Sequence, residues 1–191
     1  MDNTPLEENT PGQEKKAFNF SKELYEWAQA LVFALIFVVL VNVFVVRIIG
    51  VDGFSMEPTL HNLDKIAISN VFYTPEPGDV VVFTKESFRE EPLVKRVIAT
   101  SGQTVDINFE THEVWVDGML RDEPFINAPT EDFGDVTFPA TVPEGHIFVM
   151  GDNRNRSTDS RWSVVGMIDE RLILGKVLFR LFPLQDIGVV E

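Results

Sequence analysis

Residues 27–46, WAQALVFALIFVVLVNVFVV, divide the chain into three parts. This run of 20 residues carries no charge, and Gln29 and Asn42 are its only strongly polar members. A helix rises about 1.5 Å per residue, so a helix of this length covers the ~30 Å hydrocarbon core of a bilayer. The alternative is the core helix of a soluble protein, which apolar character on all sides over this length disfavours. We therefore predict a transmembrane helix at residues 27–46.

The flanks of this run predict how it sits in the membrane. The exit at residues 45–49, VVRII, lacks the small residues of a secretory cleavage site, so we expect an uncleaved anchor. Cations are more numerous on the N-terminal side, where the chain has Lys15, Lys16 and Lys22, than on the other side, where Arg47 follows directly. This excess predicts a single-pass protein of the cytoplasmic membrane with a cytoplasmic N-terminus.

The parts on either side differ in composition. Residues 1–26 are expected to form a disordered cytoplasmic tail, because the first 17 residues are rich in Asp, Glu, Asn, Pro and Gly. The chain has 191 residues, 45% of them hydrophobic, which suffices for one domain with its own core. We expect that domain at residues 47–191, outside the cytoplasm.

Charge and residue usage exclude several classes of protein. The net charge is −14, so the surface is unsuited to a nucleic-acid partner, whose phosphates need a basic face. There is no cysteine, which excludes disulfides and thiolate metal sites. The three histidines, His61, His112 and His146, occur singly and without metal-ligand spacing, so we expect no metal.

After Arg47 the pattern changes to short apolar runs separated by turns, which is typical of a mainly β domain. The dipeptide Asp117-Gly118 indicates a tight turn, since glycine accepts the positive φ that such turns require. Residues 119–142 are rich in proline and acids with weak periodicity, so we expect a surface excursion there. The predicted strands are residues 47–51, 65–71, 79–84, 93–99, 104–108, 113–116, 146–150 and 172–181.

The stretch GFSMEPTL, residues 53–60, places a hydroxyl next to a proline. Pro58 is incompatible with a regular helix at this point, so we expect Ser55 on a turn. A serine there either hydrogen-bonds the backbone, as most turn serines do, or is exposed for chemistry. The local sequence leaves both interpretations open.

The strand PLVKRVIAT, residues 92–100, carries a lysine among apolar side chains. Strand alternation places Lys95 on one face with Leu93 and Val97. Such a lysine either extends its amine to solvent from an edge strand or is desolvated with a lowered pKa. Only in the second case is a neutral amine available to accept a proton.

The stretch GDNRNRSTDSR, residues 151–161, packs two aspartates and three arginines into a turn-rich segment after the apolar strand HIFVM. It is either a solvated loop that holds its own shape through turns and ion pairs, or the scaffold of a site.

Five stretches, in this order after an N-terminal span, resemble type I signal peptidases: GFSMEPTL, GDVVVF, VKRVIATSG, GDNRNRSTDSR and GKVLFRLFP. The resemblance covers nearly all of residues 43–183. It implies a membrane-anchored serine endopeptidase with a Ser/Lys dyad and a mainly β catalytic domain outside the cytoplasmic membrane. The implied partners are the lipid bilayer and signal-peptide-bearing precursors, cut after small residues at the first and third positions before the scissile bond, with no cofactor.

The resemblance also implies roles for particular residues. Ser55 corresponds to the nucleophile, Lys95 to the general base, and Ser157 to the hydroxyl that orients the lysine amine. The polar group that braces the site corresponds to Asp152, Arg154, Asp159 and Arg161. Some relatives carry a hydroxyl residue two positions before the nucleophile that helps to bind the oxyanion, whereas this chain has Gly53. The second oxyanion donor and the substrate-binding residues are therefore left open.

Two other functions share some of these features. A self-cleaving repressor with related Ser/Lys chemistry should carry a DNA-binding helical module and basic charge, whereas this chain has a span and a net charge of −14. A membrane-anchored β module that binds partners without catalysis would apply if Ser55 and Lys95 lay far apart. Hydrogen-bond reach between these two side chains therefore favours the enzyme over the binding module.

Overall fold

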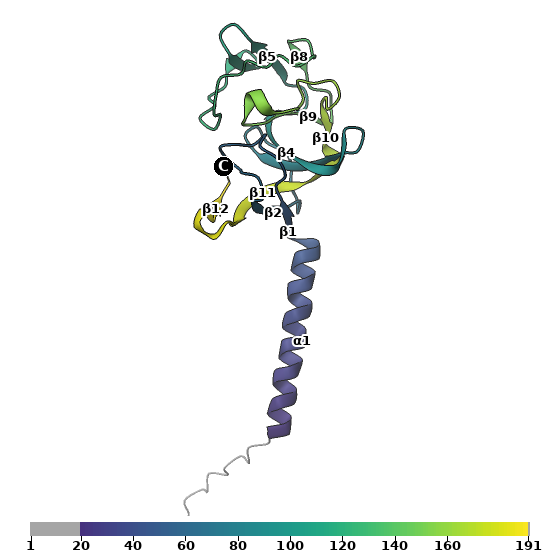
Figure 1. Cartoon of the computed structure of the whole chain (residues 1–191). Helices are drawn as coiled ribbons and strands as arrows, with labels where there is room; N and C mark the ends of the chain where they lie inside the picture. The colour runs from purple at the N-terminus through teal and green to yellow at the C-terminus, as the bar shows by residue number, and fades with distance from the viewer. Residues whose placement is uncertain (1–19, 191) are drawn as a thin grey trace, which may run out of the picture. The chain divides into compact units, whose positions relative to one another are not determined.

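The computed structural model describes residues 20–190, which divide between Val39 and Leu40 into two units. The first unit belongs to one helix, α1 (Phe20–Phe44), labelled in Figure 1. Its residues from Phe20 to Leu40 are long and apolar enough to cross a membrane, and its apolar side chains are exposed, as Trp27 is at 75%. The core helix of a soluble protein would bury such side chains, so their exposure favours a membrane-spanning helix.

The helix begins at Phe20, whereas the sequence predicts a start at residue 27. The additional turns contain Lys22, Glu23 and Glu26, which are polar but favour helix, and Lys22 lies 3.9 Å from Glu26 one turn later. A charge-free run therefore marks the apolar part of a helix and not its start. The segment predicted as a disordered tail is helical from Phe20, and residues 1–19 lie outside the described part of the chain.

The second unit contains two antiparallel sheets. The larger has eight strands in the order β1-β2-β11-β3-β4-β9-β10, with β12 beside β11, and the smaller has four in the order β7-β6-β5-β8. The strands of the larger sheet are β1 (Arg47–Gly50), β2 (Lys65–Ser69), β3 (Val80–Lys85), β4 (Arg89–Ala99), β9 (His146–Met150), β10 (Ile168–Asp169), β11 (Ile173–Phe182) and β12 (Gly188–Val189). Those of the smaller sheet are β5 (Thr104–Asn108), β6 (Glu113–Val116), β7 (Met119–Leu120) and β8 (Ala140–Thr141). This is the mainly β architecture that the sequence predicts.

All eight predicted strands are present; β5, β6 and β9 have the predicted bounds, and the other five differ by one to four residues at an end. The largest difference is in β4, which begins at Arg89 because the polar residues before Leu93 extend a hairpin with β3, where Lys85 pairs with Arg89. The sequence missed β7, β8, β10 and β12, each of two residues, because so short a pairing leaves no periodic pattern.

The central strand β4 has both faces buried from Leu93 onward. Leu93 and Val97 pack on one side with Val81 and Phe83, while Val94 packs on the other side with Met56. Lys95 is paired with Val81 of β3 and lies on the same face of β4 as Leu93 and Val97, as the sequence predicts. Its stem is therefore held in a core and not at a sheet edge.

Residues 119–142 begin with β7 and end with β8, and most of the chain between them has no regular structure. The expectation of a surface excursion holds only in part. Thr130 is fully buried, and the guanidinium of Arg96 lies 4.0 Å from the ring centroid of Phe125. The segment therefore covers a buried polar side chain of the larger sheet, Arg96 of β4.

Candidate active site

The turn that carries Ser55 is fixed by the side chains around it. Met56 and Leu60 are buried in the core, and the N–H of Leu60 donates to the carbonyl of Met56 at 2.9 Å. Gly53 has a φ of 105°, in the left-handed region that favours glycine, and its N–H donates to Oδ1 of Asn62 at 3.0 Å. Ser55 itself is only half-buried. Core contacts and hydrogen bonds thus hold a turn that leaves one hydroxyl accessible.

A second anchor comes from the segment after β9. The backbone N–H of Asn153 donates to the carbonyl of Ser55 at 3.0 Å, and its side-chain amide donates to the carbonyl of Phe54 at 3.0 Å. A Cβ on Gly151 would lie 2.4 Å from the carbonyl oxygen of Ser55 and 2.3 Å from Oγ of Ser157, so only glycine permits this approach. Two segments nearly 100 residues apart are thereby locked together.

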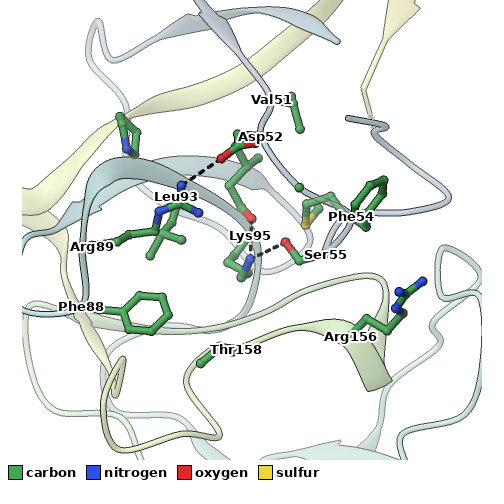
Figure 2. Close-up of a pocket in the computed structure, with 14 residues that line it drawn as sticks. Val51, Asp52, Phe54, Ser55, Phe88, Arg89, Leu93, Lys95, Arg156 and Thr158 are labelled. Carbon is green, nitrogen blue, oxygen red and sulfur yellow. Dashed lines mark hydrogen bonds and ion pairs between the residues drawn. The ribbon is translucent and has the colours of Figure 1, made fainter. Parts of the chain in front are cut away.

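Lys95 lies against this turn. Its Nζ donates to Oγ of Ser55 at 2.6 Å and to the carbonyl of Val94 at 3.1 Å, and the residue is only 2% exposed (Figure 2). Burial, opposed by the negative charge of Asp159 and assisted by the positive charge of Arg89, lowers the pKa of the Lys95 amine from 10.5 to about 8. Of the two interpretations of this lysine, the desolvated one is correct.

Behind the lysine, a buried carboxylate organises the segment 151–161. Asp159 accepts from Oγ of Ser157 at 2.7 Å, from the N–H of Gly151 at 3.0 Å and from the Arg161 guanidinium at 2.9 Å. Burial raises the pKa of Asp159, but the hydrogen bonds and charge of Arg161 outweigh it and hold the pKa below its ordinary value. The segment is therefore a buried scaffold and not a solvated loop.

Ser157 is directed at Asp159, and among the hydrogen bonds of the described residues none joins Ser157 to Lys95. Its orienting role for the lysine amine stays a prediction. The interaction that the geometry provides runs through Asp159, whose negative charge acts on the amine.

Asp152 and Arg154 belong to two separate ion pairs. Asp152 accepts two hydrogen bonds from Arg96, at 2.8 and 2.7 Å, and one from the Thr59 hydroxyl at 2.5 Å. Arg154 donates twice to Glu123, both at 2.7 Å. The resemblance placed Asp152 and Arg154 in one polar group with Asp159 and Arg161, and the structure pairs Asp152 with Arg96 and Arg154 with Glu123. These pairs connect the Ser55 turn, β4 and the 119–142 segment to the scaffold.

The sequence missed Arg96, Glu123 and Phe125. The Phe125 ring lies 4.0 Å from the Arg96 guanidinium and 5.9 Å from that of Arg154, so one ring contacts both arginines of the two ion pairs. A signal for Arg96 existed, because a second charged residue in the apolar strand PLVKRVIAT also needs a buried partner. No comparable signal marks Glu123 or Phe125 in their irregular segment.

We expect Glu123→Gln to lower the free energy of unfolding by about 2–3 kcal/mol, because it leaves the buried charge of Arg154 without a carboxylate and with neutral acceptors only. Denaturant unfolding of the detergent-solubilised chain measures this. The control is Arg171→Gln, which removes an arginine that is 88% exposed from its pair with Asp169 and should change stability little. Equal effects of the two variants would show that the Glu123–Arg154 pair is not a structural support.

Ser55 and Lys95 lie together in a pocket of about 230 Å³. Its wall also includes Phe54, Arg89 and Arg156, and Figure 2 shows the lysine and serine side chains pointing toward one another. Within residues 20–190, no group of three or more His, Cys, Asp or Glu side chains could hold a metal ion. The arrangement provides a hydroxyl and a desolvated amine within hydrogen-bond distance beside a pocket, which suits nucleophilic attack on an acyl group.

Comparison with known proteins identifies the family. The sequence model of the family described as "Signal peptidase, peptidase S26" matches residues 24–182. The chain belongs to the signal peptidase family. The signal peptidase I of Bacillus licheniformis is 34% identical over 188 residues, covering 91% of this chain and 97% of its own length. The signal peptidase IB of Staphylococcus aureus is 34% identical over 183 residues, covering 86% and 93%.

A solved structure is also similar. It is a signal peptidase I from Enterococcus faecalis, with a TM-score of 0.45 and 26% identity over 55% of this chain and 97% of that one. As a signal peptidase, this chain is an enzyme of a serine endopeptidase family, and the resemblance that its sequence stretches indicate is confirmed.

Proposed function

We propose that this chain removes signal peptides from precursor proteins, with Ser55 as the nucleophile and neutral Lys95 as the general base. The observation that carries the proposal is the 2.6 Å distance between Nζ of Lys95 and Oγ of Ser55 inside a pocket. A distance within hydrogen-bond reach is what the enzyme requires and the binding module does not. Membership of the signal peptidase family supports the substrate class.

In the first half of the reaction, the Lys95 amine takes the proton of the Ser55 hydroxyl as Oγ attacks the scissile carbonyl carbon. The developing oxyanion lies near the backbone N–H of Ser55, which makes no hydrogen bond to any other described residue and so is free to donate. The N–H of Gly53 already donates to Oδ1 of Asn62, so the second hydrogen-bond donor to the oxyanion is unassigned.

In the second half, the Lys95 ammonium returns its proton to the nitrogen of the leaving mature protein as the peptide bond breaks. An ester then joins the signal peptide to Oγ of Ser55. Neutral Lys95 next takes a proton from water, whose oxygen attacks the ester carbonyl, and returns this proton to Oγ as the signal peptide leaves. Lys95 accepts and returns each proton in this cycle, so the fraction of the enzyme with a neutral Lys95 amine controls the rate.

The rate should therefore depend on pH through Lys95. Because the base must be neutral and its pKa is about 8, we expect kcat/KM to rise about tenfold per pH unit up to pH 8 and to level off above it. Peptide cleavage over a pH series measures this rising limb of the plot of kcat/KM against pH. Arg89→Gln removes a positive charge that lowers the pKa of Lys95, so it should move the limb to higher pH. A limb below pH 6 in the wild type would contradict the assignment of Lys95.

We further propose that α1 anchors the enzyme in the cytoplasmic membrane, with the N-terminus in the cytoplasm and residues 47–191 outside. The chain should then stay in the membrane fraction after alkaline and high-salt washing, because an apolar helix holds it independently of surface charge. Protease added outside intact cells should digest a C-terminal tag and spare an N-terminal one. Release by salt, or the opposite protection, would contradict this topology.

The direct test of function is to incubate the detergent-solubilised chain with a precursor and to map the cut by sequencing the new N-terminus. A cut after small residues at the first and third positions before the scissile bond is expected, and a chelator should not reduce it. Absence of cleavage by the correctly folded chain would favour the binding module.

A further inference from the structure

The buried scaffold segment 151–161 presents two polar side chains to the pocket. Arg156 and Thr158 are its exposed residues, while Ser157 between them is buried. The backbone of Ser157 is extended, with φ −131° and ψ 123°, so its two neighbours lie on the side opposite its own side chain. Both line the pocket that holds Ser55.

These two side chains have unused hydrogen-bonding groups. The Arg156 guanidinium lies 6.0 Å from the ring centroid of Phe54 and forms an ion pair with no carboxylate in the part of the chain that the structure describes. The Thr158 hydroxyl has no hydrogen-bond partner among the same residues. Arg89, the other arginine of the pocket, is by contrast paired with Asp52 at 3.0 Å and with Glu91 at 3.2 Å.

Arg156 and Arg89 also lie on different sides of the nucleophile. In Figure 2, Arg156 and Phe54 lie to the right of Ser55, whereas Phe88 and Arg89 lie to the left. A peptide that lies over Ser55 would therefore pass Arg156 on one side of its scissile bond only. The pocket carries this cation although the chain as a whole has a net charge of −14.

We propose that Arg156 and Thr158 form a subsite for an acidic side chain of the substrate, a few residues from the scissile bond. A guanidinium binds a carboxylate through two parallel hydrogen bonds, the threonine hydroxyl can donate a third, and the Phe54 ring packs against the methylene groups of the acid. The inference rests on the proposed function, since it assumes that a peptide is cut at Ser55. It makes Arg156 a specificity residue and gives it no part in the bond-breaking steps.

The test uses the full chain in neutral detergent and pairs of fluorogenic peptides that differ only by Glu or Gln at one position. The position is moved from the third residue before the scissile bond to the third after it. At one position, we expect kcat/KM for Glu to exceed that for Gln by about threefold to tenfold, as for an ion pair at a partly desolvated rim. Arg156→Gln should bring this ratio to about one. With a third peptide that carries Lys at the same position, Arg156→Glu should prefer Lys over Glu.

Two further variants separate the subsite from general charge effects. Thr158→Val should reduce the ratio without reversing it, because one donor is lost and the guanidinium remains. Arg171→Gln makes the same change in net charge as Arg156→Gln but lies outside the pocket, so it should keep the wild-type ratio.

The remaining outcomes overturn the proposal in distinguishable ways. If no peptide is cut by the wild type, both the proposed function and the subsite fail. If peptides are cut but Arg156→Gln keeps the wild-type ratio at every position, the subsite alone fails. If Arg156→Gln slows Glu and Gln peptides equally, and only when vesicles of anionic lipid are added, Arg156 contacts phosphate headgroups and the subsite again fails.

Discussion

Replacing Ser55 with Ala should abolish precursor cleavage while the fold is retained. Removal of the nucleophile from a serine protease lowers kcat by roughly 10⁵–10⁶-fold, because the remaining groups cannot form the acyl-enzyme. The structural effect should be small, since the half-buried side chain makes one hydrogen bond, with Lys95, and the turn is held by backbone contacts of Asn153 and Gly151. The measurement is cleavage of a precursor followed on a gel with sequencing of the product.

The matched control is Ser163→Ala. It removes an exposed hydroxyl that donates to Asp135 and lies outside the pocket. It should keep the wild-type rate. Unfolding curves of Ser55→Ala and the wild type should agree within about 1 kcal/mol. Substantial cleavage by Ser55→Ala would show that another residue is the nucleophile, and the 2.6 Å contact with Lys95 would then need a different explanation.

The parts of the site that depend on local rules were predictable from the sequence. Strand alternation placed Lys95 among Leu93 and Val97, and the structure buries it there because β4 lies inside the sheet between β3 and β9. The apolar runs that became the longer strands were visible for the same reason. Pro58 indicated a turn around Ser55, and the turn is present.

The ion pairs behind the site were not predictable because their partners are set by the tertiary fold. Arg96 and Asp152 are 56 positions apart, and Arg154 and Glu123 are 31 apart. No periodic pattern connects such positions, and the segment that carries Glu123 has no regular structure. A buried arginine requires a carboxylate, but only the strand order decides which carboxylate is within reach.

The same limit applies to Arg156. In the sequence it is one of three arginines in GDNRNRSTDSR, and the resemblance gives roles to Arg154 and Arg161 but none to Arg156. In the structure the other two are fully buried in ion pairs while Arg156 is exposed to the pocket. The extended backbone at Ser157 turns Arg156 and Thr158 to the side opposite the buried Ser157 side chain.

Lys95→Met should abolish cleavage and leave stability at pH 7 unchanged or slightly raised. The Lys95 pKa falls from 10.5 in the unfolded chain to about 8 in the folded one, so the buried charge costs about 3 kcal/mol of unfolding free energy wherever both states are protonated, which is below pH 8. Methionine keeps an unbranched stem beside Leu93 and Val97 and removes this cost. It also loses the two hydrogen bonds of Nζ, to Ser55 and Val94, which together offset about 2 kcal/mol of the gain.

The pH dependence of this difference distinguishes a desolvated base from a structural cation. Between pH 8 and 10.5 the unfolded chain binds the Lys95 proton more tightly than the folded chain, so the wild type gains stability as pH rises through this window and the variant lacks that gain. Denaturant unfolding of the full chain in detergent at pH 7 and pH 10 should therefore show Lys95→Met losing about 2–3 kcal/mol relative to the wild type between the two values. Lys65→Met, which removes an exposed amine, controls for net charge. If Lys95→Met were several kcal/mol less stable than the wild type already at pH 7, Lys95 would be a charged structural partner, and its assignment as the base would have to be abandoned.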